Sequence, residues 1–320
     1  MYYPYLRGRQ NELLCLRELL EKDKLSDKVT PVIEPVKCTS TFFSTIKKFI
    51  EKDRSVIVIV NPQVGVFVKE YKEILENAKV TDSEKIKKTA EDYQTTLHNE
   101  KVIKAYVLNA RTAKKIADAE PEKKEQLFLI SENKGDDQFF IEYRDALVTK
   151  AALIPKDEDF KDEVDSDCII LEDCYEKEKR NVDYIEKPDV FFSKNHLVYA
   201  KRGYVGFSDY SIVGKHYEES GFAPLAIAIH ITYFDDRNAL WVHHFVSESN
   251  QNISDPARKF QEAMENLTRW ENYDKLEQTM GLQALIDYYE NEKFPGLGVI
   301  KKYSIMHHIE MMGKYLEGNK

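Results

Sequence analysis

The sequence predicts an α/β fold, a modified TIM-type (β/α) barrel with a β-hairpin insertion and a C-terminal helical extension. Strand and helix signals alternate through the first two-thirds of the chain, which is typical of a parallel sheet covered by helices. The early strands are runs of β-branched residues without polar alternation, as expected of strands buried on both faces. No Gly-x-Gly-x-x-Gly follows the first strand, which favours a closed barrel over an open dinucleotide-binding sheet.

The segments expected to form the barrel strands number close to eight. In chain order they are Tyr3–Leu6, Val32–Val36, Val56–Val60, Ala105–Leu108, Leu127–Ile130, Ile169–Leu171, Leu197–Ala200 and Leu225–Ile231. Helices are expected between them. After the second strand, for example, Ser40 is a candidate N-cap for a helix that carries Phe42, Phe43, Ile46, Phe49 and Ile50 on one face.

The last third of the chain departs from a regular barrel. Ile227–Phe234 and Leu240–Val246, joined by Asp235-Asp236-Arg237-Asn238, predict an antiparallel hairpin. Three helices should follow, the first capped by Ser254 and the others near Met280–Tyr289 and Val299–Leu316. We therefore expect a barrel-like domain over residues 1–250 and a helical extension over residues 251–320.

Composition restricts the classes of function. The chain has 320 residues and a formal net charge of −9, which argues against broad, non-specific nucleic-acid binding. No apolar run reaches 18 residues, so no membrane span is expected, and the N-terminus lacks the pattern of a secretory signal. Four scattered cysteines suit the reducing cytoplasm better than a disulfide scaffold, so a cytoplasmic location is expected.

Polar residues follow four successive strands at the points where those strands end. They are Arg7, Glu34, Asn61 and Asn109. In a barrel the carboxyl ends of the strands form one rim, where ligands bind. Arg7 could hold a carboxylate or phosphate, Glu34 could act as an acid or base, and the asparagines could orient a substrate. Alternatively, Arg7 and Glu34 form a structural ion pair and the asparagines cap loops.

Two further places carry candidate residues. Asp209 and Tyr210 follow Gly203 and Gly206, and they could bind substrate or, alternatively, Asp209 could fasten its own loop. His230 lies in an apolar strand and would be an acid or base if it faced the barrel interior, or else a core histidine. His243 and His244 point to opposite faces of the paired strand, and His307 and His308 are expected at the surface.

The sequence contains no motif that assigns a metal or cofactor. Cys168 and Cys174 lack a second pair at zinc-finger spacing, and there is no His-Glu-x-x-His, no Gly-x-Ser-x-Gly and no Walker loop. A metal could be bound only through oxygen ligands such as Glu34 and Asp209, so no metal site is predicted and the cofactor is left unassigned.

Several segments together resemble the Beta protein family of phage and bacterial proteins. They are Tyr2–Leu20, Pro31–Lys37, Asn61-Pro62 with Gly65, Gly206-Phe207-Ser208-Asp209-Tyr210 and the hairpin that contains Trp241. Within the family the chain is most similar to a bacterial branch often encoded beside a putative nuclease. The resemblance implies a role in mobile elements or phage defence, with a nuclease as partner protein, and it transfers no reaction.

Two hypotheses of different class follow. In the first, the protein is a non-hydrolytic component of a phage-related or defence system that acts with a partner and senses a ligand, for which an anionic small molecule is expected, at the barrel mouth. In the second, it is an enzyme that acts on a phosphorylated or nucleotide-like small molecule, with Glu34 or His230 as acid or base.

Overall fold

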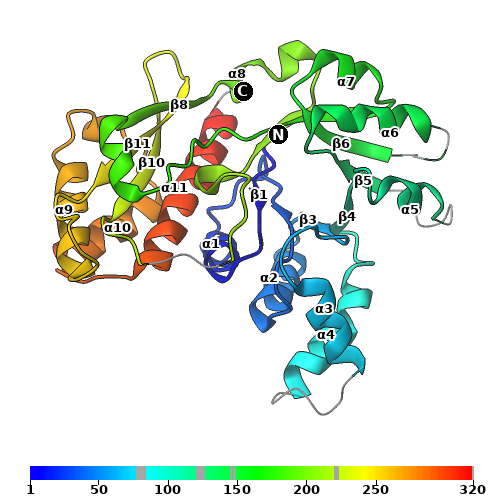
Figure 1. Ribbon diagram of the computed structural model, residues 1–320, viewed down its shortest axis with the longest axis horizontal. Coiled ribbons are helices and arrows are strands. Elements are labelled where there is room, and N and C mark those ends of the chain that lie inside the picture. Colours follow the sequence, from blue (N-terminus) through cyan, green and yellow to red (C-terminus); the bar gives the residue numbers. More distant parts are fainter. Residues whose placement is uncertain (77–83, 120–126, 145, 147–148, 220–222, 319–320) are drawn as a thin grey trace. The chain divides into compact units, whose positions relative to one another are not determined.

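The structure is a computed structural model that describes residues 1–320 apart from 77–83, 120–126, 145, 147–148, 220–222 and 319–320. The chain divides into two compact units (Figure 1). The first comprises Met1–Leu13, Asp27–Glu172 and Val198–Asp209, and the second comprises Leu14–Ser26, Asp173–Leu197 and Tyr210–Lys320.

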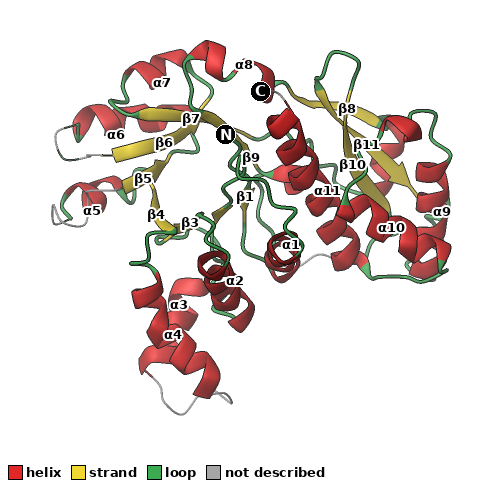
Figure 2. Ribbon diagram, turned by 180° about the vertical axis from the view of Figure 1, so that it is seen from behind, coloured by secondary structure: helices red, strands yellow, loops and turns green. Residues whose placement is uncertain are grey.

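The first unit contains an eight-stranded parallel sheet in the order β1-β2-β3-β4-β5-β6-β7-β9. The strands curve around a common axis with helices outside them, as Figure 2 shows, so the predicted TIM-type barrel is confirmed. The strands are β1 (Tyr5–Leu6), β2 (Val32–Ile33), β3 (Val56–Ile59), β4 (Val102–Val107), β5 (Leu127–Ile130), β6 (Thr149–Pro155), β7 (Asp167–Glu172) and β9 (Gly206–Asp209).

Helices alternate with these strands. They are α1 (Gln10–Glu21), α2 (Ser40–Glu51), α3 (Phe67–Glu76), α4 (Glu84–Thr96), α5 (Ala113–Ala117), α6 (Asp137–Glu142) and α7 (Glu158–Asp162). α2 buries Phe42, Phe43, Ile46 and Phe49, as expected, but its N-cap is Thr39, whose hydroxyl accepts from the Phe42 N–H, and not Ser40. Every residue of β3 is fully buried, because a strand of a covered parallel sheet meets apolar neighbours on both faces.

The N-terminal segment brings the first and last strands of the barrel together. Tyr2 bridges Val29 on one side and Phe207 on the other. The Tyr3 N–H donates to the Phe207 carbonyl at 2.9 Å, and the Phe207 N–H donates to the Met1 carbonyl at 3.1 Å. A Cβ on Gly206 would lie 2.6 Å from the Tyr3 ring, so only glycine allows the strands to approach this closely.

Two of the expected barrel strands are wrong. Residues 197 and 198 belong to α8 (Asn195–Val198), and residues 228–231 belong to a strand of the hairpin instead of the barrel. Their places are taken by β6 and β9. A short apolar segment has the same local pattern in a parallel barrel as in an antiparallel hairpin, so the sequence alone does not separate the two.

The second unit is built on a three-stranded antiparallel sheet in the order β10-β11-β8. β10 (Ala228–Phe234) and β11 (Leu240–Val246) form the predicted hairpin, and β8 (Asp189–Ser193) pairs with β11. Helices α9 (Pro256–Thr268), α10 (Met280–Glu290) and α11 (Leu297–Gly318) pack with this sheet around a core that includes Ile229, Phe245 and Phe260.

The boundary between the units differs from the expected division at residue 250. The hairpin lies with the C-terminal helices because its apolar side chains share one core with α9, α10 and α11, and β8 belongs to the same unit through its pairing with β11. Asp255, and not Ser254, caps α9, since its carboxylate accepts from the Arg258 N–H at 3.0 Å. None of the helices in the described part of the chain is long and apolar enough to cross a membrane.

Candidate functional site

The strongest candidate site is a buried polar cluster at the carboxyl edge of the barrel. Arg7 follows β1 and Glu34 follows β2, and the two side chains form an ion pair. Arg7 is 6% exposed and Glu34 is fully buried. Gly8 has a φ of +60°, and a Cβ there would lie 3.0 Å from the Glu34 carbonyl oxygen, so glycine lets the chain turn directly after Arg7.

Glu34 accepts hydrogen bonds on both carboxylate oxygens. The Arg7 guanidinium and the Tyr5 hydroxyl, the latter at 2.8 Å, donate to Oε2. The Gln63 N–H donates to Oε1 at 2.6 Å. These donors fix the carboxylate in place and use three of its roughly four acceptor positions, which disfavours Glu34 as the base that takes a proton from a substrate.

Arg7 also lies close to a second carboxylate. Its Nη2 is 3.7 Å from Oε1 of Glu132, which follows β5 across the barrel, and its guanidinium carbon lies 5.0 Å from the centre of the Tyr5 ring. The Glu132 side chain is 18% exposed, in contrast to Glu34. Arg7 is therefore held between an inner and an outer carboxylate at the rim.

The two predicted asparagines have different surroundings. The Asn61 side chain pairs with the backbone of Val107, donating to its carbonyl at 3.0 Å and accepting from its N–H at 2.8 Å, and so extends the β3–β4 ladder. Asn109 donates through Nδ2 to Oε1 of Gln63 at 3.2 Å. Asn109 is thus connected to Glu34 by hydrogen bonds through Gln63, whereas the side-chain amide of Asn61 is hydrogen-bonded to the backbone of β4.

Asp209 faces away from this cluster. Residues 3, 5 and 7 share one face of the first strand, and the Tyr3 ring lies where a Gly206 Cβ would point. Phe207 and Asp209 therefore face the other way, where Tyr2 stacks on Phe207 at 5.1 Å and donates to Asp209 at 2.8 Å. Tyr210 is buried and belongs to the second unit.

His230 is not in the barrel, because its strand is part of the hairpin in the second unit. Its Nδ1 lies 2.7 Å from Nδ1 of His244, and the two rings pack against Tyr175 and Tyr184. Burial lowers the pKa of His230 well below its ordinary value, and the neighbouring His244 lowers it further. His230 therefore belongs to a packed aromatic cluster and not to the barrel mouth.

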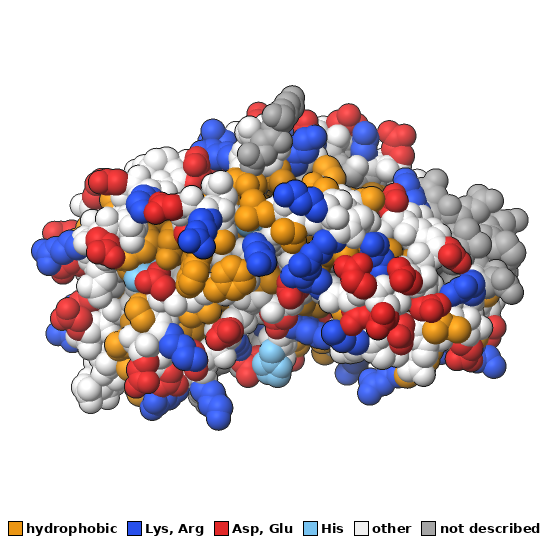
Figure 3. All heavy atoms as spheres, turned by 90° about the horizontal axis from the view of Figure 1, so that it is seen from above, with side chains coloured by type: hydrophobic (Ala, Val, Ile, Leu, Met, Phe, Trp, Pro, Cys, Tyr) orange, Lys and Arg blue, Asp and Glu red, His pale blue; other side chains and the backbone are white. Residues whose placement is uncertain are grey.

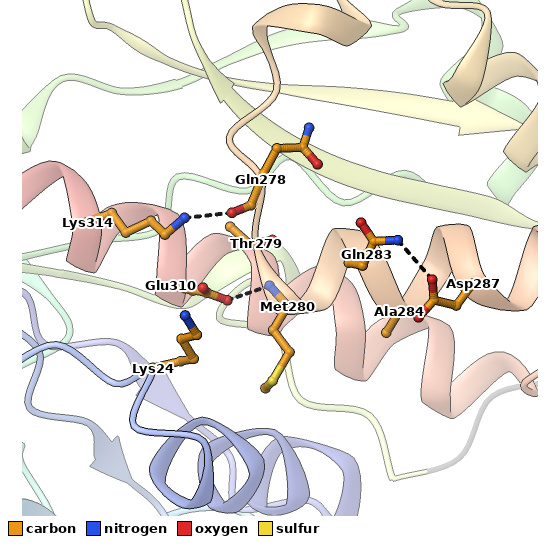
Figure 4. A pocket seen from close by; sticks show the side chains of 9 residues that line it. All are labelled: Lys24, Gln278, Thr279, Met280, Gln283, Ala284, Asp287, Glu310 and Lys314. Atoms are coloured by element: carbon orange, nitrogen blue, oxygen red, sulfur yellow. Dashed lines mark hydrogen bonds between the residues drawn. The ribbon is translucent and has the colours of Figure 1, made fainter.

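The second unit also contains a pocket of about 440 Å³ at the start of α10 (Figure 4). Its lining combines Lys24 and Lys314 with Glu310, Asp287 and the amides of Gln278 and Gln283. The polar groups largely bond to one another: Glu310 accepts from the Met280 N–H at 2.7 Å, and Lys314 donates to the Gln278 carbonyl at 2.6 Å. The pocket therefore has fewer groups left for a ligand than its lining suggests.

Three residues of the barrel cluster were not predicted from the sequence. An aromatic residue in a buried strand is more often structural, which is why Tyr5 carries no signal of a site, and Gln63 contacts Glu34 through its backbone N–H, which any residue would supply. Glu132 follows β5 at the same rim, so the rule that selected Arg7 and Glu34 would also have selected it. Among the described residues, no group of three or more His, Cys, Asp or Glu side chains is placed to hold a metal ion.

Comparisons with protein-family models, with curated proteins and with solved structures found no match to this chain.

Proposed function

We propose that the carboxyl edge of the barrel recognises a small polar ligand, and that the protein is a non-hydrolytic sensing component that acts with a partner protein. The observation that carries this proposal is the buried Arg7–Glu34 pair at the edge where barrels bind ligands. A buried ion pair is costly to desolvate, so its presence at this edge favours a binding role over a purely stabilising one.

The charges of the cluster favour a particular class of ligand. One guanidinium stands beside two carboxylates, Glu34 and Glu132, and the Asn109 and Gln63 amides lie next to them. Such a set matches a neutral or zwitterionic molecule with donors and acceptors better than a doubly charged phosphate, which the carboxylates would repel.

Recognition fits the geometry better than acid–base catalysis. Glu34 accepts three hydrogen bonds, and His230 lies in the other unit, so neither proposed acid or base stands free at the barrel edge. The partner half of the proposal, with a nuclease as the partner in a phage-related or defence system, follows from the resemblance to the Beta protein family.

A thermal-shift screen with nucleosides, amino acids, sugars and their phosphates tests this function. A ligand at a hundred times its dissociation constant stabilises the folded state by about 2.7 kcal/mol, which we expect to raise the melting temperature by several degrees. The variant Arg7→Gln/Glu34→Gln removes both charges of the pair and should lose the shift. The control Arg144→Gln/Glu163→Gln neutralises an exposed pair of the same unit and should keep it. Equal shifts in all three proteins would exclude the barrel edge as the binding site.

A further inference from the structure

Large apolar side chains are exposed at several places on the protein, and Figure 3 shows one face on which they lie among side chains of both charges. One of them, Phe191, belongs to an ordered row of aromatic residues in the second unit. Tyr233 on β10 pairs with Trp241 on β11, and Trp241 pairs with Phe191 on β8. Directly opposed residues share a face, so the three rings cross the sheet as one row, which we call the aromatic row.

The aromatic row is covered at one end and open at the other. Trp270, just after α9, packs on Tyr233 with ring centres 4.9 Å apart. Phe191 packs edge-on against Trp241 at 5.6 Å and is 45% exposed. β8 is also the edge strand of its sheet, so the open end of the row lies where a partner could approach both rings and strand.

Two carboxylates bracket the aromatic row. On one side, Asp235 accepts from the Trp241 indole N–H at 3.1 Å. On the other, Oδ1 of Asp189 accepts from the Tyr233 hydroxyl at 2.9 Å and bonds to Nδ1 of His243 at 2.7 Å. The Asp189 side chain is 41% exposed, and its contacts in the described structure use Oδ1, so Oδ2 is available to a further donor.

We propose that the aromatic row with Asp189 docks an arginine side chain of a partner protein. A guanidinium is attracted to the faces of aromatic rings and donates to carboxylates, and both groups are present here side by side. The row lies on a sheet face beside an edge strand and not in an enclosed cavity, which favours a protein over a small molecule. Aromatic residues of this kind dominate the binding energy of protein interfaces, and the row and its cover contain both tryptophans of the chain.

This inference rests on the partner half of the proposed function, and its test does not depend on the barrel edge. Both tryptophans lie at the row, so intrinsic fluorescence reports binding there directly. The probe is a short peptide of alternating glycine and arginine, and its matched control has citrulline in place of arginine, which keeps the shape and removes the charge.

The arginine peptide is expected to change the tryptophan emission with a saturable dependence on concentration, and the citrulline peptide is not. Phe191→Ala should weaken binding about tenfold, as for an interface hot spot. Ile185→Ala removes a comparably exposed apolar side chain of the same unit and should have no effect.

Three results with the peptides would overturn the inference: no binding of the arginine peptide at millimolar concentration, equal binding of the citrulline peptide, or unchanged binding by Phe191→Ala. Binding of free arginine amide as tight as that of the peptide would identify a small molecule as the occupant and would also overturn it. A ligand-induced thermal shift that depends on Arg7 should persist in Phe191→Ala. Loss of arginine docking at the aromatic row can therefore be distinguished from loss of ligand binding at the barrel edge.

Discussion

Arg7→Gln is expected to lower the free energy of unfolding by about 3–5 kcal/mol, the cost of leaving a buried charge without its partner. Glu34 is fully buried, and Arg7 supplies its counter-charge. The Tyr5 hydroxyl and the Gln63 N–H would remain as donors, but neither carries a charge. Removal of the cation is therefore far more costly than loss of an exposed ion pair, which contributes about 0–1 kcal/mol.

The double variant Arg7→Gln/Glu34→Gln should recover most of this loss, because neither side chain then carries a charge. Urea unfolding of the wild type, both single variants and the double variant gives the coupling energy, for which we expect about 2–3 kcal/mol. The corresponding double-mutant cycle on the exposed pair Arg144–Glu163 should give a coupling energy of less than about 1 kcal/mol. A coupling of the Arg7–Glu34 pair no larger than this control would show that the pair is not the buried, mutually dependent element described above.

Acidification is expected to destabilise the second unit strongly, because it contains buried neutral histidines. Burial lowers the pKa of His244 and of His307 to about 4. An unfolded histidine titrates near 6.5, so below that pH the unfolded chain binds more protons than the folded one. The free energy of unfolding is therefore highest above pH 6.5. It falls as the pH is lowered towards 4, by about 3 kcal/mol for each of these two residues.

His307 allows a direct test of this pH dependence. Its Nε2 lies 2.8 Å from the Thr232 carbonyl and must donate to it, which leaves Nδ1 to accept from the Thr279 hydroxyl at 2.8 Å. Both tryptophans lie in the second unit, so urea unfolding followed by tryptophan fluorescence at pH 7, 6, 5 and 4 reports this unit. His307→Gln can keep both hydrogen bonds without titrating and should show a smaller loss between pH 6.5 and 4. An equal loss in the variant would contradict the assignment to His307.

His307 and His308 also show why burial could not be predicted from the sequence. Adjacent positions on a helix point in different directions, and the sequence predicts both histidines at the surface, yet both are fully buried. His308 lies 3.2 Å from the Thr232 hydroxyl, so both histidines contact the same residue of β10. α11 is covered on several sides, and this depends on tertiary packing that the helical period does not encode.

The barrel itself was predictable, because buried parallel strands and amphipathic helices have distinct local patterns. β9 was not predicted because Gly206 and Ser208 interrupt its apolar pattern. Both residues serve contacts with Tyr3, which is distant in the sequence: Gly206 leaves space for the Tyr3 ring, and Ser208 donates to the Tyr3 carbonyl. The rim positions of Arg7 and Glu34 followed from the topology alone. The contacts of Glu34 with Tyr5 and Gln63 did not, since they depend on how neighbouring loops close over the rim.

Native mass spectrometry tests most directly whether the barrel edge binds a ligand. The wild-type protein, incubated with a small-molecule cell extract and desalted, should carry a bound molecule in addition to the chain mass. Arg144→Gln/Glu163→Gln should carry the same molecule, and Arg7→Gln/Glu34→Gln should show the mass of the chain alone. A wild-type protein that carries no added mass, or a double variant at Arg7 and Glu34 that retains it in full, would contradict the proposed function.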